Sequence, residues 1–112
     1  MAERDWLFSL ADISAALPND PEVMRFHYAL RHGTMKVGLY APRGPDIQPA
    51  HRQDELYIVA AGKGVFTKAG EKRRFKAGDV IFVEAGVQHR FEDFSDDFAA
   101  WVVFWGPEGG EH

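Results

Sequence analysis

Short apolar runs separated by Gly, Pro, Asn and Asp fill the chain from Val23 to Phe104. Such runs are typical of β-strands, and turn residues at these intervals predict an all-β sandwich or barrel. The one segment with helical spacing of its apolar residues is 9–17, which Pro18 ends. We expect strands at residues 23–31, 34–41, 55–61, 65–68, 73–76, 80–83, 90–94 and 98–104.

The chain of 112 residues is long enough for one domain with a single core. We divide it into a lead-in with a short helix (1–21), the β-barrel (22–106) and a tail (107–112). The tail has nothing to pack, so we expect it to be flexible and frayed. The sequence Gly62-Lys63-Gly64 does not open a helix, so we interpret it as a hairpin turn.

Charge and composition exclude several classes of partner. There are 13 basic and 17 acidic residues, and the longest basic run is Lys72-Arg73-Arg74. Because nucleic-acid binding relies on a concentrated basic surface, we expect no nucleic-acid partner. The chain has no cysteine, which rules out disulfides, thiolate catalysis and cysteine-based zinc sites. Without a signal-peptide core or a long apolar stretch, we expect no membrane association and a cytoplasmic location.

Two of the expected strands are apolar on both faces. They are LYIVAA, which follows Glu55, and FAAWVVFW from Phe98 to Trp105. A strand that is covered on one face only shows alternating polarity, so a second covering surface is implied. The candidates are the N-terminal segment with Trp6, Leu7 and Phe8, or another subunit. Of these two, we favour a homodimer.

His51, Glu55 and His89 lie beside turns and offer two imidazoles and one carboxylate. This is the ligand set of an open non-haem metal site. His51 and Glu55 would be roughly 13 Å apart on a straight strand, so the chain must reverse at the polar residues 52–54. Asp54 competes with Glu55 for the same role, but in a regular strand it would point the opposite way.

Two spaced motifs surround these residues. In the first, His51 and Glu55 are followed by LYIVAA and Gly62. In the second, Gly78 is followed by DVIFV, then Glu84-Ala85-Gly86, His89 and Asp93. With both motifs, residues 22–106 resemble the small single-domain members of the cupin superfamily. The resemblance implies a jelly-roll barrel, or double-stranded β-helix, with a divalent metal ion in its lumen.

The chain departs from the cupin motifs at three positions. Pro49 stands where the first histidine of the family's HxH pair is expected, Glu84 replaces a proline, and Asp93 replaces an asparagine. Pro49 is the important change because it cannot ligate a metal. The ligand set implied by the resemblance is therefore His51, Glu55 and His89, completed by Gln48, Gln53 or water.

The resemblance implies several functions. The first is a metal-dependent enzyme on a small organic molecule, of dioxygenase type with Fe(II) and of isomerase or lyase type with Mn, Ni or Zn. The second is a non-catalytic small-molecule-binding cupin with a degenerate metal site, and the third is a sensor or structural module. Aromatic residues here are more often core than ligand contacts. The pocket candidates are His27, Tyr57, Phe91 and Trp101.

Overall fold

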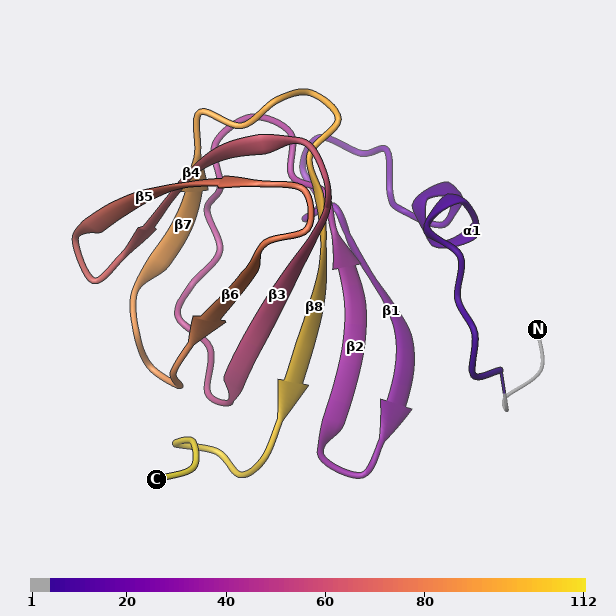
Figure 1. Ribbon diagram of the computed structural model, residues 1–112. Helices are drawn as coiled ribbons and strands as arrows, with labels where there is room; N and C mark the ends of the chain where they lie inside the picture. Colours follow the sequence, from indigo (N-terminus) through magenta and orange to yellow (C-terminus); the bar gives the residue numbers. More distant parts are fainter. Residues whose placement is uncertain (1–4) are drawn as a thin grey trace.

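The computed structural model describes residues 5–112 and confirms the all-β class. Two antiparallel sheets form the body (Figure 1). One has five strands in the order β1-β2-β8-β3-β6, and the other has three in the order β5-β4-β7. The strands are β1 (Phe26–His32), β2 (Met35–Tyr40), β3 (Asp54–Ala61), β4 (Lys63–Lys68), β5 (Glu71–Lys76), β6 (Val80–Val83), β7 (His89–Glu92) and β8 (Ala99–Trp105).

The main core lies between the two sheets and is rich in aromatic rings. Tyr57 on β3 and Phe91 on β7 are almost completely buried, and their ring centroids are 4.9 Å apart. Side chains on β8 alternate strictly, so that Ala100, Val102 and Phe104 face this core. The alternation follows from the two-residue period of a strand. The inner face of β8 therefore forms one wall of the space between the sheets.

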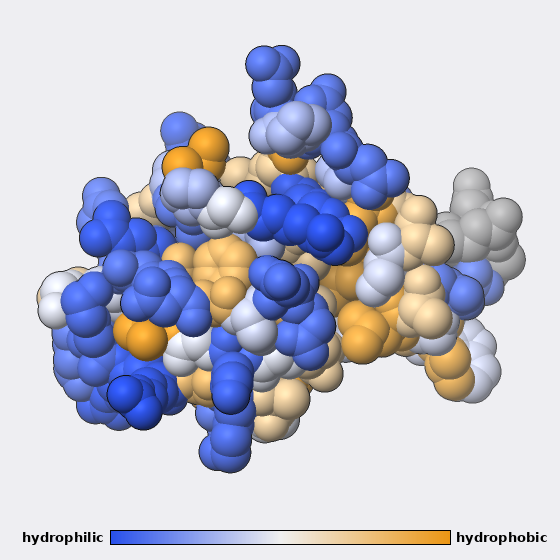
Figure 2. Space-filling view, turned by 90° about the horizontal axis from the view of Figure 1, so that it is seen from above, coloured by the Kyte–Doolittle hydropathy of each residue, from blue (hydrophilic) through white to orange (hydrophobic). Residues whose placement is uncertain are grey.

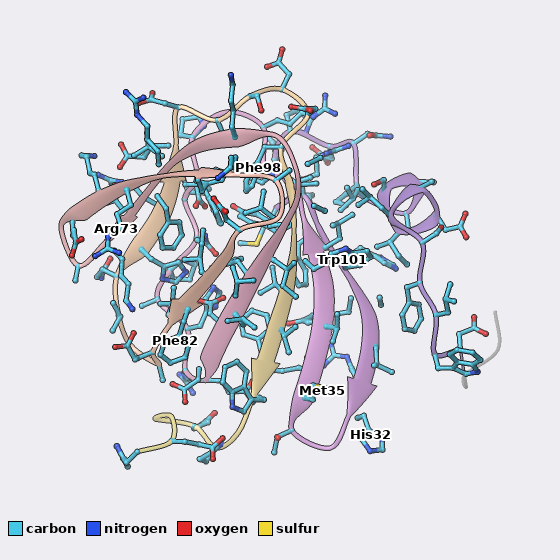
Figure 3. The ribbon with its side chains drawn as sticks, viewed as in Figure 1. His32, Met35, Arg73, Phe82, Phe98 and Trp101 are labelled. Carbon is cyan, nitrogen blue, oxygen red and sulfur yellow. The ribbon has the colours of Figure 1, made fainter. Side chains whose placement is uncertain are left out.

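The short helix α1 (Leu10–Ala15) covers part of the outer face of the larger sheet. Ser9 caps it by accepting a hydrogen bond from the Asp12 backbone N–H at 3.0 Å. Figure 3 places Trp101 on the side of the sheet that faces α1. The N-terminal segment is thus one covering surface of β8. Trp6 and Leu7 do not contribute, because they are 85% and 73% exposed.

Gly62 joins two sheets, which corrects the expectation of a hairpin at this position. β3 pairs with β6 and β8, whereas β4 pairs with β5 and β7. Gly62 has φ +85°, and a Cβ there would lie 2.6 Å from the Phe98 Cα. Glycine is required because the backbone is left-handed and closely packed against a second segment.

The C-terminal tail has packing partners, which corrects the expectation that it has none. It curls beneath the start of β3 (Figure 1). The Gly109 N–H donates to the Arg52 carbonyl at 2.7 Å, and the Glu111 N–H donates to Asp54 Oδ2 at 2.9 Å. The sequence pattern missed this contact because the tail binds through its backbone rather than through apolar side chains.

The polarity of the surface differs between the two sides of the molecule. Seen from above, Figure 2 shows hydrophilic residues gathered on the side of β4 and β5 and more apolar surface on the side of α1. β5 accounts for much of the polarity, because every residue in it except Phe75 is exposed. The three-stranded sheet therefore presents a solvated outer face.

Candidate metal centre

His51, Glu55 and His89 meet inside the barrel, and their ligand atoms all lie within 4.8 Å of one another. His51 comes from the irregular segment before β3, Glu55 from the start of β3 and His89 from the start of β7. Glu55 Oε1 lies 2.9 Å from His89 Nε2 and 3.7 Å from His51 Nε2. The cluster could hold a metal ion.

The predicted chain reversal brings His51 and Glu55 together. The chain bends at Arg52 and Gln53 and then enters β3. His51 is not at the end of a strand, as we expected, but in a segment without regular structure. The Gly86 N–H donates to the His51 carbonyl at 2.7 Å, which ties this segment to the turn that precedes His89.

The Glu55 carboxylate is the strongest sign of a metal in this group. Its side chain is 1% exposed, and apart from the imidazoles of His51 and His89 no group among the described residues is paired with either oxygen. Burying a carboxylate without partners is costly unless a cation neutralises it. The two imidazole nitrogens directed at Oε1 complete a donor set that suits a divalent transition metal.

Neighbouring groups orient the two imidazoles. His89 Nδ1 lies 2.9 Å from the Val87 carbonyl and donates to it, which leaves the Nε2 lone pair directed at the centre. Burial acts to lower the pKa of His89, but hydrogen bonding to Glu55 and to the Val87 carbonyl outweighs it, so the pKa is raised. Burial lowers the pKa of His51 despite the opposing charge of Glu55.

Gln48 occupies the position beside the two imidazoles, and Asp46 fixes it there. The Gln48 Nε2 donates to Asp46 Oδ2 at 2.8 Å. Its Oε1 therefore faces the centre, 3.1 Å from His51 Nε2 and 3.0 Å from the Tyr57 hydroxyl. Asp46 also accepts from the Tyr40 hydroxyl at 2.6 Å and from the Phe91 N–H at 2.8 Å.

Gln53 is directed away from the metal centre. Its Nε2 donates to the Thr34 carbonyl at 3.1 Å and to the Gly106 carbonyl at 2.8 Å. The side chain therefore joins the β1–β2 hairpin to the end of β8. Of the two glutamines that the sequence offered as a fourth ligand, Gln48 is the one that contacts His51.

A cavity of about 480 Å³ opens beside the centre. Gln48, His51 and Tyr57 form its inner end. Its other walls come from the β1–β2 hairpin, β8 and the C-terminal tail, including Phe26, Tyr28, Arg31, Lys36, Phe104 and Glu108. The Tyr57 hydroxyl lies 2.9 Å from His89 Nε2. Tyr57 is thus at the junction of cavity and metal centre.

The other three predicted pocket residues do not line this cavity. Phe91 is 1% exposed and belongs to the core beneath it. Trp101 packs under α1 on the outer face of the sheet. His27 pairs with Leu39, which also packs on the outer face. The His27 imidazole is therefore on the side of β1 that faces away from the cavity. The sequence gives strand alternation but not which face is inner, so it could not separate His27 and Trp101 from residues that face the cavity.

Comparison with known proteins identifies the family. The family model of the cupin domain matches residues 36–105. The uncharacterized protein SCO3923 of Streptomyces coelicolor is 40% identical over 92 residues, which cover 80% of this chain and 85% of that protein. The chain therefore belongs to the cupin family.

Solved structures agree on the fold. A Cupin 2 conserved barrel domain protein from Salinispora arenicola has a TM-score of 0.63 and 20% identity, with 91% of this chain and 89% of that one covered. KdgF from Halomonas sp. has a TM-score of 0.68 and 16% identity, with 81% and 84% covered. Among residues 5–112, no helix is long and apolar enough to cross a membrane.

Proposed function

We propose that this cupin binds a divalent transition metal through His51, Glu55 and His89 and uses it to act on a small organic molecule held in the cavity. The observation that carries the proposal is the buried Glu55 carboxylate, whose only partners among the described residues are the imidazoles of His51 and His89. Three protein ligands leave coordination positions free for a substrate. The cavity reaches the centre at His51, so a molecule entering it would approach the metal from that side.

The reaction class depends on the metal. Bound Fe(II) would support oxygen chemistry, whereas Zn, Mn or Ni would act as a Lewis acid in isomerisation or elimination. We propose Gln48 Oε1 as the fourth protein donor, because its amide nitrogen is already bonded to Asp46. Burial, followed by the negative charge of Glu55, raises the pKa of Tyr57 well above its ordinary value. Its hydroxyl is therefore a neutral hydrogen-bond donor beside the substrate position.

Metal analysis of matched variants tests this proposal. Untagged protein is purified without chelators, and its metal content is measured by elemental mass spectrometry. We expect a full equivalent in the wild type and in His32→Ala, and its loss in His89→Ala. His32 is a suitable control because it is exposed at the tip of the β1–β2 hairpin (Figure 3). Full metal content in His89→Ala would contradict the site. If the bound metal is iron, oxygen uptake is the activity to assay next. For any other metal, isomerase and lyase activities are assayed.

A non-catalytic binding protein is the second candidate function. Pro49 favours it, because this residue has no donor where cupins of the usual pattern have a histidine. A weaker metal site would then serve as an anchor for a ligand rather than as a catalyst. Ligand screening distinguishes the two functions. A compound that raises the melting temperature of the metal-loaded protein is incubated with it for a long time. Recovery of the compound unchanged favours a binding protein, and its conversion favours an enzyme.

We also propose a homodimer formed through the outer face of the five-stranded sheet. The strand register places one apolar residue from each strand in a row across this face: Leu30, Val37, Val103, Leu56 and Phe82. None of the five is fully buried, and Phe82 at the edge is 44% exposed. A row that crosses the whole sheet suits a symmetric contact with a second copy, in which each subunit offers the same patch.

Light scattering after gel filtration tests the dimer. The wild type is expected to have the mass of two chains, and Phe82→Glu that of one. Val23→Glu is the matched control, because Val23 is also half-exposed but lies before β1, outside the row. A wild type that has the mass of one chain at micromolar concentration would contradict the proposal.

A further inference from the structure

A β-bulge in β1 determines which side chains reach the cavity. Tyr28 pairs with Gly38 and Leu30 pairs with Val37, so Ala29 has no partner in the register. In a regular strand the residue that follows Tyr28 on the inner face would be Leu30. The extra residue turns Leu30 to the outer face and brings Arg31 to the inner one, where it lines the cavity. Bulges commonly redirect side chains beside active sites.

The redirected Arg31 lies directly opposite another cation. Arg31 on β1 is the register partner of Lys36 on β2, and both side chains line the cavity. Like charges placed directly across a strand pair repel each other, and this lowers stability. Within residues 5–112 neither side chain forms an ion pair or a side-chain hydrogen bond. The bulge therefore places two cations at opposite positions, which a regular strand would avoid.

Aromatic rings hold both cations in place while their N–H groups remain free. The Arg31 guanidinium carbon is 4.1 Å from the centre of the Tyr28 ring, and Lys36 Nζ is 5.7 Å from the centre of the Phe104 ring. Glu108 also lines the cavity, but it pairs with Arg52 at 3.6 Å. The mouth therefore carries an excess of positive charge.

The cationic pair is close to the metal centre. Lys36 lies over the Phe104 ring, and the centroid of that ring is 5.0 Å from that of His51. Phe26, Tyr28 and Phe104 supply an apolar wall between the mouth and the inner end. A molecule with one charged end and a planar or apolar body fits this order of groups.

We infer that the substrate is a small organic anion whose carboxylate or phosphate group binds Arg31 and Lys36 while its other end reaches the metal centre. This inference rests on the proposed function for the role of the metal. The guanidinium fork matches the two oxygens of either group, and the ammonium adds a second charge-assisted contact. The anion would also relieve the repulsion between the two cations. The bulge at Ala29 would therefore contribute to substrate specificity by placing Arg31 in the cavity.

Binding of three probes of similar shape tests the inference. Benzoate, phenyl phosphate and neutral benzamide are titrated calorimetrically into the metal-free and the zinc-loaded protein. We expect at least one anion to bind about tenfold or more tightly than benzamide, and its affinity to fall about tenfold in Arg31→Gln and in Lys36→Gln. The better anion decides between carboxylate and phosphate.

Matched controls exclude a general charge effect. Arg73→Gln and Lys63→Gln remove the same charges from the three-stranded sheet, and Figure 3 shows Arg73 far from the hairpin. Both controls should keep wild-type anion affinity. Equal affinity for anions and benzamide, no binding of any probe, or unchanged anion affinity in the two cavity variants would overturn the inference. Zinc content is measured separately, so anion binding by a protein that takes up no metal would contradict only the proposed function.

Discussion

Two neighbouring carboxylates at the start of β3 have different surroundings, although both are buried. Asp54 is 5% exposed and accepts hydrogen bonds from the Ala85 and Glu111 backbone N–H groups, each at 2.9 Å. Glu55 is 1% exposed, accepts no backbone hydrogen bond from the described residues, and is paired only with two imidazoles. Successive strand residues face opposite sides, so the two are separated by the sheet itself. Burial alone therefore does not point to a metal ligand, whereas a buried carboxylate paired only with imidazoles does.

The largest expected effect is on metal affinity. Glu55→Gln removes the charge that neutralises the ion, so we expect affinity to fall by more than about 100-fold, beyond the usual loss for an outer-shell change. In the metal-free state the same variant should be at least as stable as the wild type, because a neutral amide replaces a buried charge that only two imidazoles offset. Competition with a chelating dye and thermal unfolding without metal measure the two effects. A marked loss of metal-free stability would mean that Glu55 is a structural residue.

Asp54→Ala should lower the stability of the fold more than the metal affinity, which is the reverse of Glu55→Gln. It leaves two backbone N–H groups without their acceptor, so we expect the melting temperature to fall by about 10 °C. Metal affinity should fall far less than in Glu55→Gln, because Asp54 faces away from the centre. Asp96→Ala, at an exposed loop position, is the control and should melt like the wild type. If Asp54→Ala loses as much metal affinity as Glu55→Gln, the two carboxylates do not have separate roles.

A pair of glycine variants tests the tail contact of Asp54. Gly110 and Gly70 have nearly the same left-handed backbone, with φ +85° and +84°. A Cβ on Gly110 would lie 2.7 Å from Asp54 Oδ1, whereas one on Gly70 would meet nothing within 4 Å. Both alanine variants carry the cost of a left-handed residue, about 1 kcal/mol. Gly110→Ala should lose about 1 kcal/mol more in urea unfolding, as for a disturbed hydrogen bond. Equal losses would show that the tail does not restrain Asp54.

Sequence patterns predicted the strands well because turn residues punctuate them clearly. The expected strand 80–83 coincides with β6, and the others differ from the observed strands by a few residues at their ends. The cluster of His51, Glu55 and His89 was also predictable, because one metal required a chain reversal and the polar residues for it were present. These features depend on local spacing, which the sequence records directly.

Features that depend on the third dimension could not be predicted in the same way. The role of Asp46 depends on contacts with Tyr40, Gln48 and Phe91, and only Gln48 is near it in sequence. No turn residue in the sequence marks the bulge at Ala29, so sequence patterns could not show which side chains of β1 face inward. His27 precedes the bulge, and its face was uncertain because alternation alone does not show which face of a strand is inner. The tail contact depends on backbone groups, which have no signature in side-chain composition.

The smallest expected effect is the pH dependence that Asp54 contributes. Hydrogen bonds from the Glu111 N–H and then the Ala85 N–H lower the pKa of Asp54 in the folded protein. A carboxyl group whose pKa is lower in the folded state stabilises the fold above its unfolded pKa, about 3.9, and that contribution is lost as the pH falls through the folded pKa. The difference in unfolding free energy between wild type and Asp54→Asn should therefore be constant from about pH 7 to 5 and shrink below about pH 4.

Urea unfolding at a series of pH values measures this difference, with Asp96→Asn as a control that should stay level with the wild type. A gap between wild type and Asp54→Asn that persists unchanged at the lowest pH would show that the carboxylate charge of Asp54 is not what holds the tail. The contact would then depend on the shape of the side chain alone. In that case the contrast with Glu55 would be one of packing rather than of charge.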